Sequence, residues 1–67
     1  MALRRDTARN LQRAFFDERA FVDAVAQELE AKRIKRKEAE KLIINWFQNR
    51  DRVKHQIEWA LRDGYWM

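Results

Sequence analysis

The chain has 67 residues with no cysteine, no proline and one glycine, and its 15 basic and 11 acidic side chains leave a net charge of +4. A chain this short forms one domain at most, and the lack of cysteine excludes a disulfide that would compensate for a small core. The single histidine has no neighbouring zinc ligand, and no apolar run approaches the length of a membrane span. We therefore predict one all-α domain over residues 1–67, without cofactor or metal and located in the cytoplasm, that self-associates to complete its core.

The first predicted helix covers about residues 7–31. Asp6 or Thr7 can cap its start, because either side chain can accept a hydrogen bond from an unpaired backbone amide. Beyond this cap, apolar residues recur at alternating steps of three and four, which places them on one face of a helix. This first stripe has one charged member, Glu18, and its larger apolar members are Leu11, Phe15, Val22, Val25 and Leu29.

A basic bend is predicted next, over residues 32–36. The basic run here consists of Lys32, Arg33, Lys35, Arg36 and Lys37, interrupted by Ile34. One interpretation is a solvated turn between two helices. The other is a set of phosphate contacts to nucleic acid, because lysine and arginine neutralise phosphates.

The second predicted helix covers about residues 37–63 and carries a similar stripe. Its larger apolar members are Ile43, Trp46, Val53 and Ile57, and its one charged member is Arg50. Folding the chain back around Ile34 sets the two stripes face to face and brings Glu18 opposite Arg50, as an ion pair in the core. We therefore predict an antiparallel two-helix hairpin that dimerises into a four-helix bundle. The alternative is one unbroken helix that pairs antiparallel with a second copy.

Several large side chains lie off these stripes and predict interfaces. Phe21 and Phe47 are expected to hold the dimer. A partner protein is expected on the opposite side of the second helix and on the tail after it, because large aromatic side chains are enriched at binding hot spots. The residues predicted to bind that partner are Ile44, His55, Trp59, Tyr65 and Trp66.

Catalytic chemistry is not expected from this set of residues. The chain has no cysteine and no serine, so the commonest nucleophiles are absent. His55 and Glu58 share a helix face, but nothing beside them supplies a nucleophile or an oxyanion site. We predict a binding protein whose partners are a second copy of itself and another macromolecule, or else a structural subunit of an assembly.

One short segment resembles a known DNA-binding family. The run Trp46-Phe47-Gln48-Asn49-Arg50 resembles the recognition helix of homeodomains, in which the Trp and Phe anchor the core and the Asn reads adenine in the major groove. The resemblance implies that Asn49 reads a base and that Arg50 and Arg52 lie at the DNA. At the place where the family carries a phosphate-binding arginine, this chain has Asp51.

A second resemblance concerns size and architecture. A short, basic, self-pairing helical chain is similar to the small bacteriophage proteins that bind and inhibit host regulators. This resemblance implies an inhibitor (an anti-activator) or adaptor of a transcription or quorum-sensing regulator. We thus expect a homodimeric protein–protein interaction module, and the alternative is a small helix-turn-helix DNA-binding protein.

Overall fold

The computed structural model describes residues 3–63, except for the side chain of Asp63, and confirms the all-helical prediction. The described chain forms four α-helices: α1 (Arg5–Arg13), α2 (Glu18–Glu30), α3 (Arg36–Gln48) and α4 (Arg50–Asp63). Between residues 3 and 63, no helix is long and apolar enough to cross a membrane.

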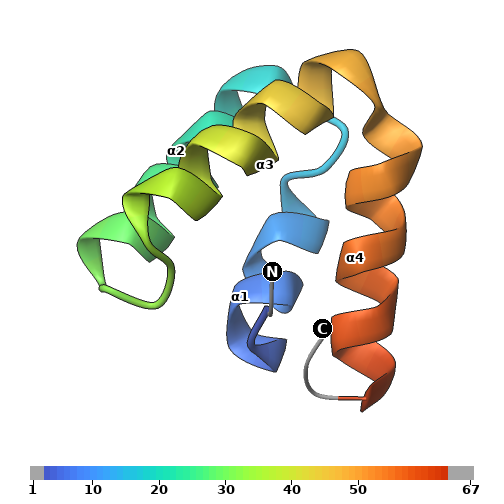
Figure 1. Ribbon diagram of the computed structural model, residues 1–67, viewed down its shortest axis with the longest axis horizontal. Helices are drawn as coiled ribbons and strands as arrows, with labels where there is room; N and C mark the ends of the chain where they lie inside the picture. Colours follow the sequence, from blue (N-terminus) through green and yellow to red (C-terminus); the bar gives the residue numbers. More distant parts are fainter. Residues whose placement is uncertain (1–2, 64–67) are drawn as a thin grey trace.

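The helices form two packed pairs, as Figure 1 shows. α2 and α3 run antiparallel and are joined by residues 31–35, while α1 packs antiparallel against α4. The chain thus folds back near Ile34, but each of the two predicted long helices is divided into two short ones. The predicted helix over residues 7–31 is interrupted at residues 14–17, and that over residues 37–63 is interrupted at Asn49.

The first interruption follows from a tight turn and a new helix cap. The backbone amides of Ala14 and Phe15 bond to carbonyls three residues earlier, at 3.2 and 3.3 Å, which tightens the end of α1. Asp17 then caps α2, because its Oδ1 accepts a hydrogen bond from the Ala20 amide at 3.1 Å. The Phe15 carbonyl left in this turn accepts a buried 2.8 Å hydrogen bond from Trp46 Nε1, which ties the turn to α3.

The second interruption is a sharp corner between α3 and α4. Asn49 has φ −147° and ψ 77°, outside the helical region. Arg50 Nε donates to the Trp46 carbonyl at 3.3 Å, and the guanidinium carbon lies 4.1 Å from the centre of the Trp46 ring. The predicted ion pair between Glu18 and Arg50 was therefore wrong: Arg50 is bound to Trp46, and Glu18 is exposed in the first turn of α2.

The turn between α2 and α3 shows how a bend forms without glycine. The amides of Lys32 and Arg33 donate to the carbonyls of Leu29 and Glu28, both at 3.0 Å, in the pattern of a Schellman motif. Lys32 takes the left-handed conformation that this motif needs, with φ 62°. The Glu38 carboxylate then accepts from the Lys35 amide at 3.0 Å and caps the start of α3.

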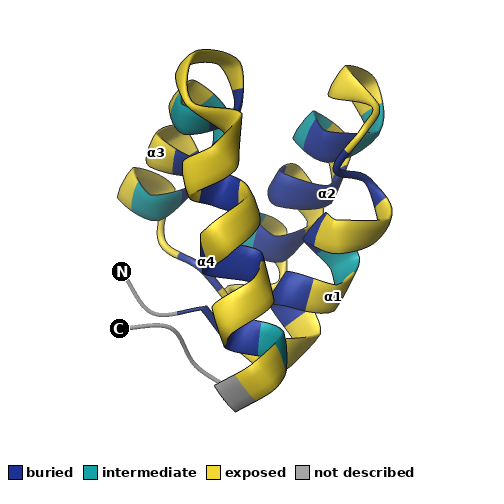
Figure 2. Ribbon diagram, turned by 90° about the vertical axis from the view of Figure 1, so that its right-hand side faces the viewer, coloured by how far each residue is buried: buried dark blue, intermediate teal, exposed yellow. Residues whose placement is uncertain are grey.

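The core is closed within one chain, where all four helices meet. The Phe21 ring stacks on Trp46 at a centroid distance of 5.3 Å, and Phe15 contacts Phe21 edge-on at 6.4 Å. Figure 2 shows the buried residues on the inward sides of the helices. Of the residues predicted for the core or dimer, those buried here are Leu11, Phe15, Phe21, Val25, Trp46, Val53 and Ile57. Val22, Leu29 and Ile43 are partly buried at its edge.

One of these predictions needs correction. Phe21 was expected to hold the dimer, but its side chain is fully buried inside its own chain and reaches no surface. The cause is the pair of interruptions, because four short helices enclose Phe21 on more sides than a two-helix hairpin would. Phe47, also expected to hold the dimer, lies on the surface of its own chain.

Candidate interaction surfaces

Large apolar side chains remain on the surface although the core is closed. The exposed fractions are 87% for Phe16, 53% for Phe47, 51% for Ile44 and 46% for Trp59. Contiguous exposed apolar surface marks interaction sites, whereas single exposed apolar side chains are common on soluble proteins. These four side chains fall into three separate places.

The first place is the outer side of α3, formed by Ile44 and Phe47 and called the α3 patch below. The two residues are three apart, so their side chains lie on the same side of the helix. The opposite side of α3 carries Leu42 and Trp46 into the core. Phe47 is braced by an edge-on contact with the Trp46 ring at a centroid distance of 5.2 Å. The patch is therefore held in place by the core beneath it.

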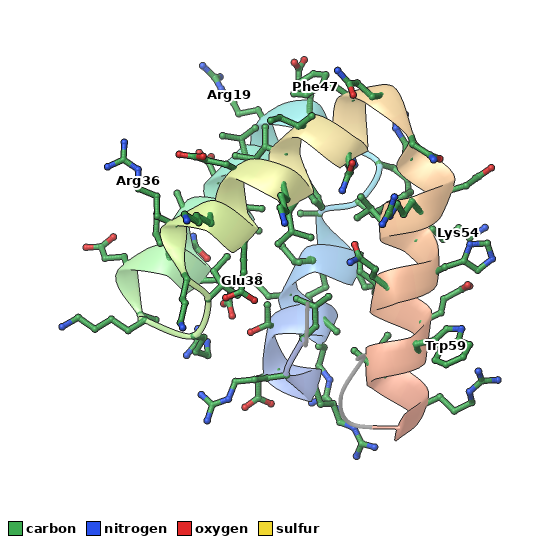
Figure 3. The ribbon with its side chains drawn as sticks, in the orientation of Figure 1. Arg19, Arg36, Glu38, Phe47, Lys54 and Trp59 are labelled. Atoms are coloured by element: carbon green, nitrogen blue, oxygen red, sulfur yellow. The ribbon has the colours of Figure 1, made fainter. Side chains whose placement is uncertain are left out.

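The second place is the outer side of α4, where His55 and Trp59 are both exposed. The Arg62 guanidinium lies 5.5 Å from the centre of the Trp59 ring. Figure 3 shows Phe47 at the α3–α4 corner and Trp59 towards the other end of α4. The corner thus separates Ile44 from His55 and Trp59, which the sequence analysis had placed on one face. Tyr65 and Trp66, predicted for the same face, lie outside the described residues.

The third place is a groove between α1 and α4, called the α1–α4 groove below. Its volume is about 110 Å³, and it is lined by Gln12, Phe15, Phe16, Lys54, Ile57 and Glu58. Phe15 and Ile57 are buried and form its apolar floor, whereas Phe16, Lys54 and Glu58 are exposed. Phe16 lies off the apolar stripe of the first predicted helix, and periodicity therefore indicates its exposure. The groove beside it could not be predicted from periodicity, because it depends on the turn at residues 14–17.

A buried ion pair lies where α1, α2 and the α2–α3 turn meet. Only 1% of the Glu28 side chain is exposed, and its two oxygens accept from Arg33 Nε and Nη2, both at 2.8 Å. Asn10 Nδ2 donates to the same carboxylate at 3.0 Å. Hydrogen bonds from Arg33 lower the pKa of Glu28 to about 2; burial opposes this effect, and the hydrogen bond from Asn10 reinforces it. The sequence analysis missed this cluster because Glu28 and Arg33 are five residues apart across a helix end.

The residues predicted to contact nucleic acid are dispersed. Arg33 is engaged by Glu28, and Arg36 forms an exposed 3.4 Å ion pair with Glu40. The exposed members without such a partner are Lys32, Lys35 and Lys37 at the α2–α3 turn, and Asn49 and Arg52 at the start of α4. The homeodomain-like run lies across the α3–α4 corner. Within this run, Trp46 is buried and Phe47 is exposed.

Within residues 3–63, no group of His, Asp or Glu side chains could hold a metal ion. The chain matches no protein-family model, no curated protein and no solved structure. Its function is therefore argued from these surfaces.

Proposed function

We propose that this protein is a protein–protein interaction module that acts by contact, as a homodimer, on a regulatory protein. The observation that carries the proposal is the α3 patch. Ile44 and Phe47 are each about half exposed and adjacent on one side of α3, although the core of the chain is already closed. The fold leaves about half of each side chain in contact with water, and a partner that covered this apolar surface would remove that cost.

The α3 patch has the properties of a binding hot spot. Phe47 presents a large ring with few rotatable bonds, and its contact with Trp46 restricts the ring before any partner binds. Lys41 and Glu40, both exposed on α3, supply a polar border. A regulatory protein is the class of partner implied by the resemblance to small bacteriophage inhibitors. An inhibitor of this kind needs no catalytic group, which agrees with a sequence free of serine and cysteine.

The test is capture by immobilised protein from a lysate of the source cells. Phe47→Ser should lose the captured protein, because the patch loses its main apolar contact, while circular dichroism should show unchanged helicity. Lys37→Ser, an exposed change on the same helix, is the matched control and should retain capture. Retention by both variants would contradict the assignment to the α3 patch.

The second candidate function is DNA binding. The observation that favours it is the exposure of Asn49 and Arg52 at the start of α4, together with the lysines of the α2–α3 turn. Phosphate contacts weaken steeply as salt rises, so a salt-dependent mobility shift with duplex DNA detects them. If Asn49→Ala abolished a sequence-specific shift and left the fold intact, DNA binding would replace the first proposal.

A further inference from the structure

We propose that the α1–α4 groove is the dimer interface, with Phe16 of each copy inserted into the groove of the other. This inference rests on the homodimer in the proposed function and assigns the surface that forms it. The α3 patch stays free for the regulatory partner. Figure 2 shows α4 with α1 beside it, the two helices that frame the groove.

The groove and Phe16 fit each other as a hole and a knob. Phe16 is by far the most exposed large apolar side chain of the described chain, at 87%. The groove volume of about 110 Å³ is comparable with the roughly 150 Å³ of an apolar cavity that holds benzene. Its floor is formed by Phe15 and Ile57, which are 6% and 2% exposed, and Phe16 adds an apolar wall, so an inserted phenyl ring would meet apolar atoms.

Knob and hole occur on the same small surface. Phe16 projects from the turn after α1 and itself lines the groove, and its ring contacts Phe15 edge-on at 5.2 Å. In a two-fold dimer, each surface must be complementary to itself. A knob beside a hole satisfies this condition, because one rotation inserts both Phe16 rings at once.

The charges at the rim of the groove point to a second copy as the occupant. Lys54 and Glu58 both line the groove from α4, four residues apart, which corresponds to about 6 Å along the helix. When two α4 helices run antiparallel across a two-fold axis, Lys54 of each copy faces Glu58 of the other.

The side chains of Lys54 and Glu58 are both available to form ion pairs with a second copy of the chain. In the described chain, the ion pairs are those of Arg33 with Glu28 and Arg36 with Glu40, so Lys54 and Glu58 are not paired with each other. Both are exposed. The net charge of +4 opposes self-association in general, and the rim, with one charge of each sign, adds no net charge to that repulsion.

The first experiment measures mass by light scattering over a range of concentrations. The wild-type chain should reach twice its 8.2 kDa monomer mass. Phe16→Ser should raise the dimer dissociation constant by about tenfold or more, because it removes a buried ring from each of two grooves. Ile44→Ser, the matched change on the α3 patch, should leave the dimer unchanged.

The second experiment uses charge reversal. Lys54→Glu gives a rim with two carboxylates and Glu58→Lys a rim with two ammonium groups, so each variant alone should be mainly monomeric. A mixture of the two should form a heterodimer, because every facing pair is then opposite in sign. Lys41→Glu, the same charge change on α3, should neither weaken the dimer nor pair with Glu58→Lys.

The results of these two experiments distinguish an error in the assigned dimer interface from an error in the proposed function. A wild-type monomer at all concentrations would overturn the homodimer itself. A wild-type dimer that persists in Phe16→Ser, with no preference for the charge-reversed mixture, would overturn only the assignment to the groove. Capture of the regulatory partner through Phe47 is measured separately and depends on neither result.

Discussion

Glu28 is the buried charged side chain of the described structure, and three elements meet on it. Its carboxylate is bound by Arg33 from the α2–α3 turn and by Asn10 from α1. A buried charge without such partners would be strongly destabilising, so the pair joins α1 to the turn only while Glu28 is ionised. A property of a single residue, its protonation, therefore affects how two helices are held together.

This arrangement predicts the acid sensitivity of the fold. The pKa of Glu28 is lowered from 4.5 to about 2, so its carboxylate stabilises the folded chain fully above pH 4.5. That stabilisation, on the order of 3 kcal/mol, should be lost as the pH falls from about 4.5 to about 2. Urea unfolding followed by circular dichroism across this range measures it.

Two variants make this measurement specific. Glu28→Gln should be less stable than wild type at pH 7 and should lose the Glu28 part of the pH dependence. Glu30→Gln, an exposed change at the end of the same helix, should retain that dependence. If wild type and Glu28→Gln lost stability in parallel as the pH fell, Glu28 would not be the responsible group.

At the scale of the elements, the two interruptions determine the fold. Asp17 caps α2, and without this cap the chain could continue as a helix through residues 14–17. Asp17→Ala should cost about 1 kcal/mol of unfolding free energy, because the Ala20 amide loses its acceptor. Chemical denaturation measures this loss. Asp23→Ala is the control, because it removes an exposed carboxylate from the interior of α2, where it caps no helix end. An equal loss of unfolding free energy in Asp23→Ala would contradict the capping role of Asp17.

The stripes of the sequence predicted which residues are buried better than they predicted how long the helices are. Leu11, Val25 and Ile57 are buried as their spacing indicates, because the spacing of apolar residues identifies the side of a helix that faces the core. The same spacing runs through residues 14–17 and through Asn49 without a glycine or proline to mark an end. The signals there, an aspartate and an asparagine that favour helix starts, are weak, and at residues 14–17 the hydrogen bond from Trp46 to the Phe15 carbonyl adds a tertiary contact. That contact joins residues 31 apart, which local pattern cannot show.

The candidate surfaces were predictable only in part, for the same reason. Ile44 and Trp59 are exposed as expected, since each lies off the apolar stripe of its helix. Their separation depends on the α3–α4 corner, and the groove beside Phe16 depends on the α1–α2 turn. Both features come from the interruptions that helix periodicity misses, so the groove and the division of the surface required the fold itself.

At the scale of the whole molecule, the position of the core changes the argument for self-association. A chain of 67 residues was expected to need a partner in order to fold. Four short helices, however, surround Phe21 and Trp46 within one chain, and the exposed residues proposed for the dimer (Phe16, Lys54 and Glu58) are not part of that core. Dimer formation then adds stability to a fold that already exists, and it should be separable from folding.

The last prediction tests this separation through the dependence of unfolding on concentration. Over about a hundredfold range, the thermal midpoint of the wild-type chain should rise with concentration, because the dimer binds only folded chains. The midpoint of Phe16→Ser should be lower and independent of concentration, with a cooperative transition and native helicity at the most dilute point. These properties follow from a core that contains Phe15, Phe21 and Trp46 and excludes Phe16. If dilute Phe16→Ser were unfolded, one chain could not close its own core, and folding would depend on the second copy.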